Sequence, residues 1–188
     1  MGIYTTFFVC TPPELAAAFP GWLPPLTTPV KRDTTKPFTG ETTTVESREP
    51  EWTDDPDTDS PDLDFVFSHP HWDTKGLTEV ELGPLADALG LEPKFEYPLY
   101  APPSSHVYLV GLPTELVPKL VSLDANGLEA VAAKWAAAMS TPEYTHSVTG
   151  NKLNDGWTPS DAMGILHEFV TLARQASADQ RLYLLIAV

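Results

Sequence analysis

Four short runs of apolar and aromatic residues along the chain predict β-strands, at residues 3–10, 63–67, 106–112 and 182–188. In the second run Leu63, Phe65 and Phe67 alternate inward, as in a strand with one buried face. The last run is almost uninterrupted, which is typical of a strand that is covered on both faces. We therefore expect these four strands to form one central sheet, with mixed or antiparallel pairing.

Apolar residues spaced three and four positions apart predict two long helices. The first covers residues 126–139, where one face carries Leu128, Val131, Ala132, Trp135, Ala136 and Met139. The second begins after Thr158, which suits an N-cap, with Pro159 at the first helical position and Asp161 at the third. It runs to about residue 178. Both helices should pack on the central sheet.

Shorter helices are expected at residues 12–18, 84–89 and 113–120. Thr11 and Glu14 have the pattern of a capping box, in which each side chain bonds to the backbone N–H of the other residue. Pro84 best fits the first turn of its helix, because proline lacks the N–H that an inner turn needs, and Gly90 follows the helix end. Residues 95–103 are punctuated by prolines and are expected to form a connector.

Residues 22–62 show no helical period and are rich in proline, threonine and acid. Residues 30–38 and 41–47 flank Thr39-Gly40 and predict one β-hairpin, which is mainly polar on both faces and therefore peripheral. Residues 49–62 combine like charges with three prolines, so we expect a mobile loop there. Together these patterns predict a single α+β domain over residues 1–188, with an irregular, acidic and proline-rich insertion at 22–62.

Charge changes the functional picture most. The 188 residues include 26 acidic and 11 basic ones, which give a formal net charge of −15. This disfavours nucleic acid as a partner, because phosphate binding needs clustered Lys and Arg, and Lys31 with Arg32 is the only adjacent basic pair. Residues 46–64 contain one basic residue, Arg48. Their acidic residues are Glu46, Glu49, Glu51, Asp54, Asp55, Asp57, Asp59, Asp62 and Asp64.

This acidic loop is the predicted contact surface for a basic protein partner. Trp52 lies within it and has little nearby to pack on, which favours a partner contact for its side chain. The residues assigned to the contact are Trp52, Asp54, Asp55, Asp57 and Asp59.

One segment offers metal chemistry. His69, His71 and Asp73 occupy alternate positions directly after a predicted strand. They resemble the start of the H-x-H-x-D-H run of metallo-β-lactamase-type hydrolases, a loop that binds two metal ions. The next residue departs from that run, because Thr74 stands in place of the histidine. The competing interpretation is that both histidines are turn residues and that Trp72 packs on the core.

No other motif predicts catalysis or a cofactor. Asp55, Asp57 and Asp59 have the spacing of a calcium loop, but Ser60 and Val66 stand where an EF-hand needs Gly and Glu. The sequence has neither the serine motif of a nucleophile elbow nor a glycine-rich phosphate loop.

Cys10 is the only cysteine and lies within an apolar run, so a buried and inert thiol is expected. A lone thiol favours a reducing compartment. The first residues lack the basic region of a signal peptide, and no apolar stretch is long enough to span a bilayer. We therefore expect a cytoplasmic protein that does not contact the membrane.

The order of the predicted elements resembles that of the YfbM-like family of small bacterial proteins. Members of that family open with Met-Gly and a strand, as Met1-Gly2-Ile3-Tyr4 does here. Their second half has a tyrosine-containing strand, a helix pair, a loop with Tyr and Trp, and a last helix that leads to an apolar strand. The same order occurs here at residues 106–109, 113–139, 144–157 and 162–188. The resemblance implies an α+β fold and transfers no catalytic residue.

The favoured hypothesis is a non-enzymatic binding or inhibitor protein, of the immunity or antitoxin type, that engages a basic protein partner. One alternative is a metal-dependent hydrolase that uses His69, His71 and Asp73. Another alternative is a DNA-mimic inhibitor, which needs carboxylates in rows at the spacing of phosphates.

Overall fold

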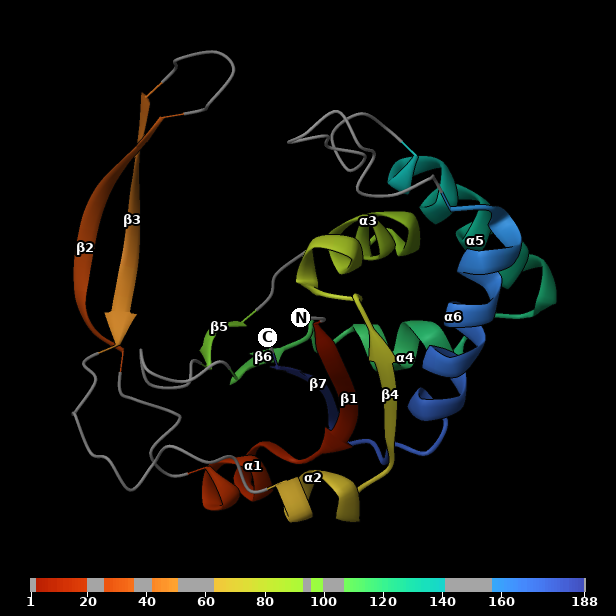
Figure 1. Cartoon of the computed structure of the whole chain (residues 1–188), viewed down its shortest axis with the longest axis horizontal. Coiled ribbons are helices and arrows are strands. Elements are labelled where there is room, and N and C mark those ends of the chain that lie inside the picture. The colour runs from red at the N-terminus through yellow and green to blue at the C-terminus, as the bar shows by residue number, and fades with distance from the viewer. Residues whose placement is uncertain are drawn as a thin grey trace.

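The chain folds around an antiparallel β-sheet that carries helices on both faces (Figure 1). The computed structural model describes residues 3–19, 26–35, 42–50, 63–92, 96–99, 107–140 and 157–187. The strands of the sheet are β1 (Tyr4–Cys10), β4 (His71–Lys75), β5 (Glu96–Leu99), β6 (Val107–Gly111) and β7 (Arg181–Ala187). The helices are α1 (Pro12–Ala18), α2 (Leu63–Ser68), α3 (Glu79–Leu89), α4 (Leu116–Val121), α5 (Ala125–Met139) and α6 (Pro159–Ala173). The predicted α+β fold class is confirmed.

β7 occupies the centre of the sheet, although it is the last strand along the chain. The strand order is β4-β1-β7-β6-β5, and each neighbouring pair is antiparallel. In this register Leu184 lies between Phe7 of β1 and Val110 of β6. All residues from 182 to 186 are buried, which confirms the prediction of a strand covered on both faces.

Alternate residues of the strands build two hydrophobic cores, one on each face of the sheet. On one face Phe7 and Leu184 belong to a core that also includes side chains of α3, α4, α5 and α6. On the other face Phe8 and Tyr183 pack with side chains of α1 and α2. Each fully buried side chain of this kind stabilises the fold by roughly 1.5–3 kcal/mol. The sheet is therefore the middle layer of three.

The predicted capping box at α1 is present, the predicted N-cap Thr158 of α6 also forms one with Asp161, and both helices start where expected. At α1, the Glu14 N–H donates to Thr11 Oγ1 at 3.3 Å and the Thr11 N–H donates to Glu14 Oε2 at 2.8 Å. At α6, the Asp161 N–H donates to Thr158 Oγ1 at 3.2 Å and the Thr158 N–H donates to Asp161 Oδ2 at 2.9 Å. Reciprocal bonds of this kind satisfy two of the backbone donors that a helix start leaves unpaired.

The two capping boxes should make stability depend on pH. Hydrogen bonds from the backbone and side chain of Thr11 lower the pKa of Glu14, and those from the side chain and backbone of Thr158 lower the pKa of Asp161. A carboxyl group whose pKa is lowered by folding stabilises the protein above its unfolded pKa, and that stabilisation is lost as the pH falls through the folded pKa. We expect the urea concentration at the unfolding midpoint to decrease as the pH drops below about 4. This decrease of the midpoint with pH should be less steep in the Glu14→Gln, Asp161→Asn double variant. Equal slopes in the variant and the wild-type protein would contradict this explanation.

The prediction of a strand at residues 63–67 is wrong, because this segment is the helix α2. Val66 is fully buried, whereas Leu63 and Phe67 are 43% and 48% exposed, so the alternation of Leu63, Phe65 and Phe67 does not mark a buried face. The Phe65 ring packs edge-on against Phe19 with ring centroids 5.7 Å apart. A short apolar run has no period that separates a strand from a helix, and packing beside α1 decides the outcome here.

The edge strand beside β1 is β4, which the hydrophobic pattern did not predict. Trp72 is its only hydrophobic residue, and its burial alternates between exposed and half-buried positions. Trp72 stacks on Phe7 with centroids 5.4 Å apart and meets Phe169 of α6 edge-on at 5.3 Å. One tryptophan therefore anchors an otherwise polar strand to the core, and the prediction that Trp72 packs there is confirmed.

α3 begins earlier than predicted, so Pro84 lies inside the helix rather than in its first turn. Thr78 provides the start, because its N–H and hydroxyl donate to Glu81 Oε2 at 2.7 and 2.6 Å. Gly90 ends the helix with φ of +73°, as expected of a C-terminal glycine.

The predicted connector at residues 95–103 contains a strand, because residues 96–99 form β5 at the edge of the sheet. An edge strand tolerates a proline such as Pro98.

The predicted hairpin is confirmed with different bounds. β2 (Leu26–Thr35) pairs with β3 (Thr42–Pro50) in antiparallel register, with Lys31 opposite Glu46. The two strands form a separate sheet of their own, which Figure 1 shows standing beside the layered body. The predicted turn at Thr39-Gly40 lies outside the described residues. Of the loop predicted at residues 49–62, the first two residues belong to β3, and residues 51–62 lie outside the described residues.

Candidate functional site

The residues predicted to contact a basic partner lie outside the part of the chain that the structure describes. They are Trp52, Asp54, Asp55, Asp57 and Asp59. Their role in binding therefore stays a prediction. The other candidate residues, His69, His71 and Asp73, are described and can be placed in the fold.

The structure does not bring His69, His71 and Asp73 together as a metal-binding group. Nδ1 of His69 donates to the Phe65 carbonyl oxygen at 2.8 Å, and Nδ1 of His71 donates to the His69 carbonyl oxygen at 2.9 Å. Asp73 Oδ1 accepts from the hydroxyl of Thr6 at 2.6 Å. Among the described residues no three His, Cys, Asp or Glu side chains are grouped so as to hold a metal ion. The contacts of these side chains fit a turn and an edge strand.

Cys10 is a buried thiol in β1, as the sequence predicted. Its exposed fraction is 0%, and burial together with the negative charge of Glu14 raises its pKa to about 12. The thiolate is the reactive form of cysteine, so the folded protein should hold an unreactive group.

We expect a thiol reagent such as DTNB to label the native protein at least an order of magnitude more slowly than the urea-unfolded protein at pH 8. The change in absorbance at fixed reagent concentration gives both rates. A native rate equal to the unfolded rate would contradict the burial of Cys10.

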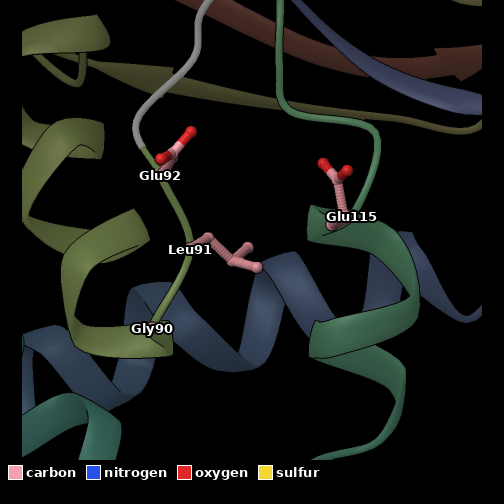
Figure 2. A pocket seen from close by; sticks show the side chains of 4 residues that line it. All are labelled: Gly90, Leu91, Glu92 and Glu115. Carbon is pink, nitrogen blue, oxygen red and sulfur yellow. The ribbon is translucent and has the colours of Figure 1, made fainter.

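A depression of about 230 Å³ lies between the end of α3 and the start of α4. Gly90, Leu91 and Glu92 form one wall, and Glu115 stands on the other. Figure 2 shows the carboxylates of Glu92 and Glu115 on opposite sides of the depression, both directed toward the same end, with Leu91 projecting between them. The depression thus has a carboxylate on each side and one apolar side chain, that of Leu91.

Local sequence explains each wall of this depression. On one side the Leu91 N–H donates to Ala86 O at 2.9 Å and the Gly90 N–H donates to Asp87 O at 3.0 Å, which turns the chain sharply after α3. On the other side Glu115 directly precedes α4, and the hydroxyl of Thr114 donates to its carboxylate at 3.0 Å.

The depression therefore brings two acidic residues together beside the apolar side chain of Leu91. The sequence patterns did not single out Glu92 or Glu115. Both helix boundaries were expected near these residues, but their proximity depends on how α3 and α4 pack on the sheet.

No helix in the described ranges is both long and apolar enough to cross a membrane. Neither a protein-family model, nor a curated protein, nor a solved structure matches the chain. The resemblance to the YfbM-like family therefore stays a prediction, and any functional proposal depends on the residues themselves.

Proposed function

We propose that this chain is a non-enzymatic binding protein that engages a basic protein partner through its acidic surface, in the manner of an immunity or antitoxin protein. The observation that carries this proposal is the formal net charge of −15. An excess of one sign attracts partners of the other sign over long distances and raises the rate of their encounter.

The depression between α3 and α4 supports the proposal with local geometry. Glu92 and Glu115 are exposed and add negative charge beside Leu91 to the surface that a basic partner would meet. The acidic loop, with Trp52, Asp54, Asp55, Asp57 and Asp59, is the second surface that we assign to the partner. Together they would present negative charge at separate places on the molecule.

The described part of the chain also favours binding over catalysis. Its cysteine is buried with a raised pKa, which removes the strongest nucleophile from use. The rings of His69 and His71 each donate to a backbone carbonyl oxygen instead of facing a common point. These contacts weaken the hydrolase alternative.

Capture of partners from a native lysate tests the proposal. We expect the tagged protein to retain at least one basic protein at low salt and to release it at moderate salt, because ions screen exposed charges. Absence of any captured basic protein, or capture that does not depend on salt, would contradict the proposal. A DNA-binding protein in the captured fraction would favour the DNA-mimic alternative.

Two charge-matched variants show whether the depression takes part. Removing the two negative charges as Glu92→Gln, Glu115→Gln should weaken binding about fivefold, since two exposed charges near a basic partner contribute on the order of 1 kcal/mol. The control Glu129→Gln, Glu168→Gln removes the same charge from exposed positions on α5 and α6. Equal effects from both variants would mean that net charge acts alone and that the depression has no special role.

A further inference from the structure

One edge of the sheet has backbone groups that pair with no described strand. β4 is the last strand on its side, and its hydrogen bonds to β1 reveal which of its residues face outward. The Val9 N–H donates to Pro70 O and the Gly76 N–H donates to Ile3 O, both at 3.1 Å. Bonded pairs recur at every second residue of an antiparallel ladder, so Trp72 and Thr74 bond to β1.

The N–H and C=O groups of His71, Asp73 and Lys75 consequently point away from the sheet. These three residues are exposed, and no other strand among the described residues pairs with this edge. Edge strands with open backbone groups are the usual place where an extended segment of another protein joins a sheet.

Side chains along β4 indicate what kind of segment would fit. Trp72 is only half-buried on the α6 side, so an apolar side chain beside it would cover more of the indole. On the other face Asp73 carries an exposed negative charge, which favours a basic residue opposite. The Lys75 ammonium lies 5.0 Å from the centre of the Tyr4 ring and disfavours a second basic residue at the next pair.

We propose that the outer edge of β4 binds an extended segment of a partner protein, added antiparallel, with apolar residues on the Trp72 face and one basic residue opposite Asp73. This inference rests on the proposed function of binding a basic partner and names the backbone that would receive it. Antiparallel addition matches every other pair in this sheet.

A second copy of the chain fits this edge less well. Pairing two β4 strands over their full length, from His71 to Lys75, would put Asp73 opposite Asp73, and like charges directly opposite destabilise a ladder. Shifting the register to separate the two carboxylates shortens the overlap, because β4 ends at Lys75 and is followed by Gly76 with φ of +70°. Two copies would also bring together chains of net charge −15 each.

The test uses the full chain and the acetylated, amidated peptide Thr-Val-Lys-Val-Thr as a probe, with amide hydrogen exchange read by NMR. In the free protein the amides of Trp72 and Thr74 should be protected and those of His71, Asp73 and Lys75 should exchange quickly. At a peptide concentration about ten times its dissociation constant, exchange of the latter three should slow about tenfold.

Two methylated peptides separate backbone pairing from charge attraction. N-methylation of the lysine removes a donor that would face β4, so this peptide should not protect the amides. N-methylation of a valine alters only the outward side of the added strand, so this peptide should protect them as the parent does. The variant Asp73→Pro lacks an outward N–H, so it should lose peptide binding while the amides of Trp72 and Thr74 stay protected. The variant Asp73→Asn keeps this N–H and should retain part of the peptide binding.

Three results of the exchange experiment would contradict binding of a partner segment at β4. If both methylated peptides bind equally well, the basic side chain acts without the strand edge, which overturns this inference and leaves the proposed function standing. If no peptide slows exchange at His71, Asp73 and Lys75, the edge is not a docking site. If these amides become protected at high protein concentration without peptide, the occupant is a second copy and the proposed partner is wrong.

Discussion

Ending the chain after Gln180 is expected to abolish the cooperative unfolding transition. This change removes β7, which pairs with β1 on one side and β6 on the other. Both hydrophobic cores would lose side chains from the middle of the sheet, since Leu184 belongs to one core and Tyr183 to the other. Five buried side chains would be lost, at roughly 1.5–3 kcal/mol each, which is comparable to the whole stability of an ordinary domain, roughly 5–15 kcal/mol.

Near-ultraviolet circular dichroism and a urea titration measure this result. The truncated chain should give no signal from packed aromatic rings and no sigmoidal transition. The single substitution Leu184→Ala is the milder control, because it keeps the strand and should cost about 2–5 kcal/mol. A truncated chain that still unfolds in one cooperative step would show that β7 is not the central strand.

Replacing Trp135 by alanine is expected to cost about 3–5 kcal/mol, the range for removing a large buried aromatic side chain. The indole is 0% exposed and meets the ring of Trp157 edge-on at a centroid distance of 4.9 Å. Its N–H donates to the carbonyl oxygen of Glu81 at 2.9 Å, which ties α5 to α3. The alanine variant would leave both a cavity and a carbonyl group without its donor.

Two further variants divide the effect of Trp135→Ala into its parts. Trp135→Phe keeps most of the ring volume and loses the N–H donor, so it should cost less than the alanine variant. Lys134→Ala changes an exposed neighbour on the same helix and should shift stability by no more than about 0.5 kcal/mol. Urea midpoints at constant slope give all three values. A cost below about 1 kcal/mol for Trp135→Ala would contradict its place in the core.

Helix starts and the central strands were predictable because their signals are local. Thr11 with Glu14, and Thr158 with Asp161, satisfy backbone donors within one turn, so the sequence alone contains the whole interaction. The run at residues 182–188 is apolar at nearly every position, and only burial on both faces explains such a pattern.

The segment from Leu63 to Lys75 was predicted wrongly for the opposite reason. Most apolar side chains of this segment lie in α2, a helix too short to show a helical period of apolar residues. The strand in the segment, β4, is mainly polar. β4 exists because Trp72 reaches Phe7 and Phe169, which lie far away in the sequence. Tertiary contacts therefore decide both elements, and no local pattern contains them.

The acidic character of the candidate site was predictable, but the residues that form it were not. Net charge indicated an acidic contact surface, but the depression combines Glu92 from the end of α3 with Glu115 from the start of α4. Their approach follows from the packing of both helices on one face of the sheet. The open edge of β4 was hidden for the same reason, since its outward residues depend on the register with β1.

The salt dependence of the association rate with a captured basic partner tests the central claim most directly. Between ionic strengths of about 0.01 M and 0.15 M the screening length falls from about 30 Å to about 8 Å. Stopped-flow measurements should show an association rate that falls steeply over this range, while the dissociation rate changes little. An association rate that stays constant with salt would contradict a binding function built on the acidic surface.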